Sequence, residues 1–524
     1  MISLYNTNDI RKVDAYAIET LGISGIVLME NASINIFNEI LFFIYPNNNI
    51  KRIGFVCGRG NNGGDGFATA RHFANADFTV NVISIGSKNK MSKDCLTNYN
   101  ILKKLSNNNK DIHIYSYKSK KDLVRLNSSQ IIVDAILGSG VKGELKEPYK
   151  TIVQSLNKKK AKKIAIDIPT GLDPDKGTGK LIFQSDLTVS LGDYKKGLFF
   201  NKGLTHCGKV VKAGIGISQK YFEELETNSF LTEPEDVFNF LPRREKNVHK
   251  YSAGKVLTIA GSGEYPGAAV LTSKSVLKTG AGASVLCFPK SIRNLIQKKL
   301  GEVVVISYAD GESEFLSEEN LNEISDKISW ADSISIGPGL GRHIKTQNAV
   351  LSILKNRKAK RIVIDADAIF ALNKKRYKKI NLKNSVLTPH YGEFASLIGL
   401  TINELQSDIL KFGNKFVKDT GAFLVLKGAP TIIFTPKGES IINSTGNPGM
   451  AKFGTGDVLT GLIAGFASQK TSLKKAIIIA VYLHSLSADI LSFKQTELTF
   501  TATDILNNIP STIKFLIKSC AELS

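Results

Sequence analysis

Two kinds of hydrophobic spacing alternate along this chain, and together they predict a layered α/β protein. Short apolar runs such as Arg52 to Cys57 stop at glycine-rich or acidic residues, which is typical of strands buried on both faces. The stretch from Ile10 to Leu21 instead carries apolar residues at helical spacing. Because the two patterns alternate through both halves, each half is expected to form a largely parallel sheet between helices.

In the first half, three predicted strands stop at polar residues. The strand from Arg52 to Cys57 runs into GRGNNGGDG, and the strands in QIIVDAILGSG and KIAIDIPTGLD end at Asp134 and Asp167. Ligands of doubly wound sheets gather where the carboxyl ends of strands meet, so these loops are expected to share one crevice. The alternative, for each acid taken singly, is that it only anchors its loop, and the joint arrangement makes this alternative weaker.

The glycine spacing around Asp65 predicts a loop of bare backbone that can wrap a pyrophosphate. Asn61 and Asn62 add amide carbonyl oxygens, which are hard ligands suited to a cation such as K⁺ or to a ribose. The glycines of this predicted loop are Gly58, Gly60, Gly63, Gly64 and Gly66.

The second half ends its strand and helix alternation at GNPGMAKFGTGDVL. Gly454 and Gly456 precede an apolar helical pattern that starts at Val458, so the positive end of this helix is expected to face free backbone N–H groups. That arrangement predicts an anion cradle. Asp457 is placed to accept a proton from a hydroxyl while phosphoryl charge develops on the cradled side. A glycine-rich turn before a core helix is the alternative for this loop alone.

Three further strand exits in the second half carry candidate residues. Asp365 and Asp367 of DADA are expected to anchor loops, with a place near a metal as the alternative. His390 stands between a proline and a nearby glycine, and this rigidity favours contact with a substrate. Lys427 follows a strand, and its ammonium can pair with a phosphate as a point charge.

Charge and composition narrow the function classes. A chain of 524 residues fits two or three domains, and its net charge of +22 suits anionic ligands. The lysine clusters lack aromatic interleaving, which predicts a solvated basic surface and no nucleic-acid site. These clusters are Lys158 to Lys163, Lys374 to Lys379, and the pair Lys195 and Lys196.

The five cysteines are far apart and form no CxxC pair, so neither a disulfide framework nor a zinc site is expected. The start of the chain lacks the pattern of a signal peptide, and no uninterrupted apolar run reaches about 18 residues. We therefore expect a cytoplasmic location and no membrane attachment.

LMENA, NNGGDG, DAILGSG and DIPTGLD resemble the NAD(P)H-hydrate epimerase family over residues 1–217. The resemblance implies a Rossmann-like three-layer αβα domain in which Asp167 handles the substrate and the proton at C6. It also implies a K⁺ ion held by Asn62, Asp134 and Thr170, with Thr170 in place of the usual serine. The implied substrate-binding residues are Asn61, Asn62, Gly63, Gly64, Asp65, Gly138, Ser139, Gly140, Val141, Lys142, Gly143, Glu144 and Asp167.

HKYSAGKVLTIAGS, YPGA, GPGLG, DADA, TPHYGE, LKGAPT and the GTGD stretch resemble the ADP- or ATP-dependent NAD(P)H-hydrate dehydratase family over residues 229–515, a ribokinase-like α/β domain. The implied substrate contacts are Ala268, Gly339, Gly341, His390 and Asp457. The implied nucleotide contacts are Lys427, Gly428, Ala429, Pro430, Thr431 and Gly456. Phe453 stands where a glycine is common, and an inward side chain would alter the cradle.

Together the resemblances imply a bifunctional repair enzyme for NADHX and NADPHX, with a linker at residues 218–228. The second domain would use ADP or ATP with Mg²⁺ to turn the C6 hydroxyl of the S epimer into a phosphate, which the ring nitrogen electrons expel. Products would be NAD(P)H, phosphate and, from ADP, AMP. The first domain would interconvert the epimers. A homo-oligomer is expected. Two alternative functions are a ribokinase-type small-molecule kinase and a non-enzymatic scaffold that senses dinucleotides or associates with RNA.

Overall fold

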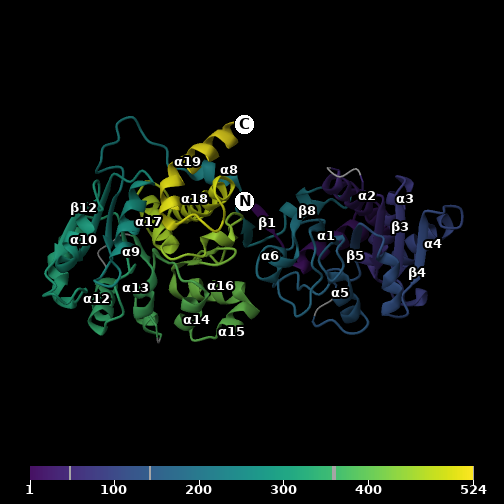
Figure 1. Ribbon diagram of the computed structural model, residues 1–524, viewed down its shortest axis with the longest axis horizontal. Coiled ribbons are helices and arrows are strands. Elements are labelled where there is room, and N and C mark those ends of the chain that lie inside the picture. The colour runs from purple at the N-terminus through teal and green to yellow at the C-terminus, as the bar shows by residue number, and fades with distance from the viewer. Residues whose placement is uncertain (46–48, 141–142, 357–360, 374, 523–524) are drawn as a thin grey trace. The chain divides into compact units, whose positions relative to one another are not determined.

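The structure is a computed structural model that describes residues 1–45, 49–140, 143–356, 361–373 and 375–522. Val141, Lys142 and Lys374, named above, lie outside these described residues. The chain forms two compact units, one of Ser3–Ser229 and one of Met1–Ile2 with Phe230–Ser524 (Figure 1).

A 7-stranded parallel sheet organises the N-terminal unit, in the order β4-β3-β2-β5-β6-β7-β8. The chain builds outward from β2 to β4 and then starts again at β5 on the other side of β2. The topological switch therefore lies between β2 and β5, where doubly wound sheets bind their ligands. The strands are β2 (Arg52–Cys57), β3 (Thr79–Ser84), β4 (Ile112–Ser116), β5 (Ile131–Ala135), β6 (Lys162–Ile166), β7 (Leu187–Leu191) and β8 (Lys209–Ala213).

Helices cover both faces of this sheet, which confirms the predicted three-layer α/β architecture. Alternate residues of β2 enter different cores: Phe55 packs with residues of α2, α3 and α4, and Val56 packs with residues of α5. The helices are α1 (Thr7–Glu19), α2 (Gly25–Ile44), α3 (Asn61–Asn75), α4 (Lys93–Leu105), α5 (Tyr149–Asn157), α6 (Lys202–His206) and α7 (Lys220–Glu223). Three 3-10 helices are η1 (Lys88–Lys90), η2 (Lys120–Leu126) and η3 (Lys196–Leu198).

The C-terminal unit contains an 11-stranded sheet in the order β1-β9-β18-β17-β16-β15-β14-β13-β10-β11-β12. The strands from β16 to β12 in this order are parallel to their neighbours, and β17 is antiparallel to β16 and to β18. The strands are β1 (Ile2–Leu4), β9 (Ser229–Leu231), β10 (Lys255–Ile259), β11 (Ala283–Pro289), β12 (Val304–Tyr308), β13 (Ser333–Ile336), β14 (Arg361–Ile364), β15 (Ser385–Leu387), β16 (Phe423–Leu426), β17 (Ile432–Phe434) and β18 (Ser440–Ile442).

Helix α17 lies against α9, α18 and three central strands of this sheet. Glycines allow the close packing on α9, because a Cβ added at Gly461 would lie 2.1 Å from the carbonyl oxygen of Thr272. The helices are α8 (Pro234–Phe240), α9 (Pro266–Leu277), α10 (Arg293–Gln297), α11 (Leu321–Trp330), α12 (Ile344–Lys355), α13 (Ala366–Ala371), α14 (Tyr391–Ile398), α15 (Ile402–Ser407), α16 (Ile409–Thr420), α17 (Thr455–Ala467), α18 (Leu473–Lys494) and α19 (Ala502–Ala521). The 3-10 helices are η4 (Lys290–Ile292), η5 (Glu318–Asn320), η6 (Arg376–Lys379) and η7 (Pro448–Met450).

Two helices of the described residues are long and apolar enough to cross a membrane by length and composition. Helix α18 is 72% buried over its most apolar window and contributes to the core beside α17 and α19. Helix α2 is 33% buried over that window and packs one side on α3 and on the sheet. The cytoplasmic location and the homo-oligomeric state stay predictions.

The segment expected to be a linker carries the short helix α7. Phe222 on this helix is buried together with Tyr5, Ile10 and Val13 of the same unit. Although residues 218–228 are mostly polar, the apolar contact of Phe222 therefore attaches this segment to the N-terminal core.

Candidate active sites

The glycine-rich stretch after β2 is helical from Asn61 onward, so the prediction of a bare loop through Gly66 was wrong. Its glycines allow close packing. A Cβ added at Gly63 would lie 2.0 Å from the carbonyl oxygen of Gly58, and one added at Gly66 would lie 2.5 Å from the Cβ of Ala135. Helix α3 consequently begins directly against the ends of β2 and β5, at the switch point of the sheet.

A cavity of about 810 Å³ opens at this edge of the N-terminal sheet. It collects side chains from α1, α3, the exits of β5 and β6, and the segment after β7. The predicted residues that line it are Asn61, Asn62, Asp65, Gly138, Ser139, Gly140, Glu144 and Asp167. Gly63, Gly64, Gly143, Asp134 and Thr170 do not line it. The strand exits therefore do converge on one crevice, as the sequence predicted.

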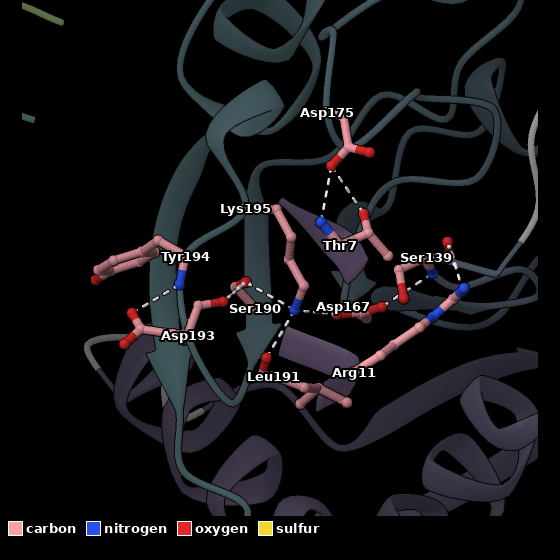
Figure 2. A network of polar contacts seen from close by, with 10 residues as sticks. All are labelled: Thr7, Arg11, Ser139, Asp167, Asp175, Ser190, Leu191, Asp193, Tyr194 and Lys195. Carbon is pink, nitrogen blue, oxygen red and sulfur yellow. Dashed lines mark hydrogen bonds and ion pairs between the residues drawn. The ribbon is translucent and has the colours of Figure 1, made fainter. Parts of the chain in front are cut away.

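Asp167 and Lys195 form a buried ion pair in this cavity, as Figure 2 shows. The Lys195 ammonium lies 2.6 Å from the Asp167 carboxylate and also donates to the Leu191 carbonyl at 2.6 Å and to the Ser190 hydroxyl at 3.3 Å. The backbone N–H of Ser139 donates to the other Asp167 oxygen at 3.0 Å. Burial raises the pKa of Asp167, but the Lys195 charge and these donors outweigh it and hold the pKa below its ordinary value.

Lys195 is 1% exposed, so the prediction that the Lys195 and Lys196 pair belongs to a solvated surface was wrong for Lys195. Asp167 itself adopts a left-handed backbone with φ of 67°, an unusual conformation for a residue with a side chain. The turn after β6 thus holds this carboxylate in one orientation, and the lysine after β7 neutralises it.

The residues implied for K⁺ have a suitable set of oxygen atoms. Both polar atoms of the Asn62 side chain are buried without a partner among the described residues. Asp134 is buried at the end of β5 and accepts from the Thr170 hydroxyl and backbone N–H, both at 2.8 Å. The Asn62 amide oxygen thus has no hydrogen-bond partner in the described ranges and lies near the residues that follow β5 and β6. Such an oxygen is a suitable ligand for a hard cation. Among the described residues no group of three His, Cys, Asp or Glu is placed to hold a metal ion.

In the C-terminal unit, the exits of β10, β13, β14, β15 and β16 are neighbours in the sheet, and α17 begins beside them. Helix α17 starts at Thr455 with Gly454 in the left-handed conformation at its N-cap, which confirms the predicted helix behind the cradle. Asp457 lies in its first turn, and its carboxyl has no hydrogen bond within the described part of the chain. Burial is the main reason that the pKa of Asp457 is raised to about 7, and the negative charge of Asp365 raises it further.

Lys427 is tied to Asp365 by an ion pair of 2.8 Å, and the other Asp365 oxygen accepts from the Thr460 hydroxyl at 2.7 Å. Burial lowers the pKa of Lys427, but Asp365 and then Glu393 outweigh it and raise the pKa. A Cβ added at Gly456 would lie 3.3 Å from the Lys427 ammonium. Asp365 therefore holds a permanent positive charge beside the first turn of α17.

Removing the Asp365 carboxylate should destabilise the protein strongly. Asp365→Ala leaves the Lys427 ammonium without its partner, and breaking a buried pair in this way costs about 3–5 kcal/mol. We expect a loss of that size in the free energy of unfolding measured with urea. Asp326→Asn, an exposed change in the same unit, should have almost no effect. Equal stability of both variants would contradict the assigned role of Asp365.

Asp367 anchors the GPGLG loop, as the sequence predicted. Its carboxylate accepts from the Gly341 N–H at 3.0 Å and from the Arg342 side chain at 3.1 Å. The loop also approaches the start of α9, because a Cβ added at Gly339 would lie 3.0 Å from the Cβ of Ala268. The structure thus brings together Ala268, Gly339 and Gly341, three of the implied substrate contacts.

The rigidity expected for His390 has a local cause. Its Nδ1 accepts from the Glu393 N–H while Glu393 accepts from the His390 N–H, which forms a capping box at the start of α14. The ring is 61% exposed and remains available to a ligand. His390 also forms a parallel β-bridge with Lys427, so the two residues lie on adjacent strand exits.

The remaining nucleotide residues follow Lys427 along the chain. A Cβ added at Gly428 would lie 2.1 Å from the Tyr391 ring, so only glycine fits there. Ala429, Pro430 and Thr431 form the turn into β17. Phe453 is fully exposed, so its side chain does not enter the cradle.

Asp14 and Lys195 are two charged cavity residues whose place in the site the sequence did not predict. Asp14 lies in the middle of an amphipathic helix pattern, which gives no sign that its carboxyl faces a cavity. Lys195 follows β7 just as Asp167 follows β6, and this parallel between strand exits is the signal that could have revealed it.

Two protein families match this chain, one in each unit. Residues 256–511 match the family described as NAD(P)H-hydrate dehydratase, and residues 25–197 match the YjeF-related protein N-terminus. The bifunctional NAD(P)H-hydrate repair enzyme Nnr of Moorella thermoacetica is 34% identical over 516 residues, covering 98% of this chain and 97% of that protein. The Nnr enzyme of Dictyoglomus turgidum is 31% identical over 524 residues, covering 99% of each.

A solved structure supports the fold of the C-terminal unit. A ribokinase-like superfamily protein of Enterococcus faecalis V583 is 28% identical, with a TM-score of 0.50, covering 56% of this chain and 98% of that chain. The ribokinase-like fold expected from the sequence is therefore confirmed.

Proposed function

Because this chain belongs to the family of bifunctional NAD(P)H-hydrate repair enzymes, we propose that its two units repair hydrated nicotinamide dinucleotides in two steps. The epimerase domain, residues 1–217, interconverts (R)- and (S)-NAD(P)HX at C6. The dehydratase domain, residues 229–515, converts the S epimer to NAD(P)H with ADP or ATP as the phosphoryl donor. With ADP the products include AMP and phosphate.

The observation that carries the dehydratase step is the position of Asp457 in the first turn of α17. A carboxyl with a pKa of about 7 and no hydrogen-bond partner among the described residues is suited to act as a general base near neutral pH. Asp457 takes the proton of the C6 hydroxyl as that oxygen attacks the terminal phosphorus of the nucleotide. The oxygen leaves later as phosphate when the N1 electron pair forms a C6–N1 double bond. Loss of a proton from C5 to solvent then forms the C5–C6 double bond of NAD(P)H, and the electron pair returns to N1.

Positive groups around Asp457 are suited to the charge that develops on the phosphoryl group. The Gly456 N–H belongs to the first turn of α17 and has no acceptor inside the helix, and the Lys427 ammonium lies next to it. Lys427, Gly428, Ala429, Pro430 and Thr431 are proposed to contact the nucleotide. Ala268, Gly339, Gly341 and His390 are proposed to contact the hydrate.

Mg²⁺ is proposed to enter this site with the nucleotide. The Asp365 and Asp367 carboxylates already accept hydrogen bonds from the chain, so the phosphates would supply most of its ligands. The ion would neutralise phosphate charge. Asp457 would remain available for its proton.

The dehydration rate should increase with pH through about 7. Because the general base must be ionised, kcat/KM is expected to fall about tenfold for each pH unit below that value. Asp365 faces Asp457 and raises its pKa, so Asp365→Asn should move the midpoint to lower pH, and rates measured with purified (S)-NADHX would show it. A flat wild-type profile from pH 5.5 to 8, at about constant ionic strength, would exclude Asp457 as the base.

In the epimerase domain, Asp167 is the proposed carboxylate that exchanges a proton with the hydrate. Its ion pair with Lys195 keeps it ionised and oriented toward the cavity. The substrate would contact the predicted residues that line the cavity. Gly63 would act indirectly, because its lack of a side chain lets α3 begin against Gly58. Asn62, Asp134 and Thr170 would hold K⁺, which would supply a fixed positive charge for the anionic dinucleotide.

A ribokinase-type kinase would leave a phosphorylated product in solution, whereas the dehydratase releases inorganic phosphate. Incubation of (S)-NADHX with ADP or ATP therefore separates the two functions. We expect reduced nicotinamide and phosphate to form in equal amounts. A stable phosphorylated hydrate without reduced nicotinamide would favour the kinase.

A further inference from the structure

Three of the carboxyl groups that line the epimerase cavity interact electrostatically with one buried ammonium. Asp14, Asp65 and Asp167 all line the cavity together with Lys195. An ammonium has three N–H donors, and those of Lys195 are directed at Asp167, the Leu191 carbonyl and the Ser190 hydroxyl. Asp14 and Asp65 are therefore left without a direct bond to the ammonium.

Asp14 faces the cavity from α1 and is half-buried. Its carboxyl has no hydrogen-bond partner among the residues that the structure describes. The charged groups that act on it are Lys195, Asp167 and Arg11, and Arg11 donates to the Ser139 carbonyl at 3.0 Å. Asp65 also interacts with it electrostatically.

The pKa values of the two carboxyls are shifted in opposite directions. Burial raises the pKa of Asp14 to about 6, against the attraction of Lys195. Asp167 has a lowered pKa because Lys195 contacts it directly. A pair of acids with pKa values pushed apart in one cavity is the usual arrangement of a proton donor and a proton acceptor.

We propose that Asp14 is a second catalytic carboxyl of the epimerase, the proton donor that works with Asp167 as acceptor. This inference rests on the proposed epimerase function and adds a residue to that same site. The orphaned polar atoms of buried Asn62, which lines the cavity with both acids, independently point to a ligand there.

The exchange of the C6 configuration then follows in two balanced steps. Asp14 gives its proton to the C6 hydroxyl, the C–O bond breaks as the N1 electron pair forms a C6–N1 double bond, and water leaves. Water adds to the opposite face of C6, the electron pair returns to N1, and Asp167 takes the released proton. Solvent transfers the proton back to Asp14, and the reverse conversion starts from the form with the proton on Asp167.

The test compares Asp14→Asn with Glu19→Gln, an exposed change on the same helix. Purified (R)-NADHX is incubated with each full-length variant, and formation of the S epimer is followed after subtraction of the uncatalysed rate. We expect Asp14→Asn to lower kcat for exchange by about 10²-fold or more with little change in KM. Glu19→Gln should match the wild type, and all three proteins should dehydrate (S)-NADHX at the same rate.

The pH profile separates proton donation from a structural role. Since the donor must be protonated, wild-type exchange should decline as pH rises above about 6, and Asp14→Asn should lose this decline. Asp14→Glu should restore part of the rate. The inference is wrong if Asp14→Asn exchanges the epimers at the wild-type rate and with the wild-type pH profile. It is also wrong if Asp65→Asn loses the decline with pH while Asp14→Asn keeps it. A wild-type protein without any exchange would instead remove the proposed epimerase function itself.

Discussion

Asp457→Ala is expected to abolish nucleotide-dependent recovery of NADH from (S)-NADHX. Loss of a general base lowers a rate by about 10²- to 10⁴-fold. Asp457 also stands where the N–H groups of α17 and the Lys427 ammonium converge, so no other carboxyl described in that turn can replace it. The measurement is the absorbance of reduced nicotinamide after addition of ADP or ATP to the purified variant.

The same protein provides its own control for folding. Asp457→Ala should still interconvert the epimers, because that chemistry is assigned to residues of the other unit. Asp326→Asn should keep both activities. Recovery by Asp457→Ala within a few fold of the wild type would show that the base is elsewhere.

Asp167→Ala should stop epimer exchange and spare recovery from the S epimer. The variant loses the carboxylate that Lys195 and the Ser139 N–H hold in place. We expect exchange to fall by about 10²-fold or more, measured as formation of (S)-NADHX from the purified R epimer.

Because Asp167→Ala also leaves the Lys195 ammonium buried without its partner, the N-terminal unit is expected to lose about 3–5 kcal/mol of stability. Asp167→Asn keeps a hydrogen-bond acceptor for this ammonium and should show the same loss of exchange with less destabilisation. Exchange at the wild-type rate by Asp167→Asn would contradict the assignment. Equal loss of both activities would mean that the substitution unfolds the chain.

The fold followed from the sequence because its strands are buried on both faces and therefore appear as short apolar runs. Convergence of Asp65 and Asp167 on one cavity followed as well, since parallel strands end at the same edge. The apolar helical pattern after Gly456 predicted that Asp457 lies at the start of a helix, which the structure confirms.

The surroundings of the predicted residues did not follow, because they depend on packing between distant segments. Lys195 belongs to a basic pair in the sequence, and only the turn after β7 directs its ammonium to Asp167. The glycines after Asn62 resemble a loop, yet their lack of a side chain serves the contact of α3 with two strand ends. Asp14 carries no motif at all, and its significance depends on which face of α1 meets the cavity.

The most direct test of the central claim is incubation of the purified chain with a mixture of NADHX epimers and ADP or ATP. If two separate sites cooperate, reduced nicotinamide should form from both epimers, with one phosphate released for each. The slower part of the recovery should disappear in Asp167→Asn, and the whole recovery should disappear in Asp457→Ala. Failure of the wild-type chain to regenerate the coenzyme with either nucleotide would contradict the account.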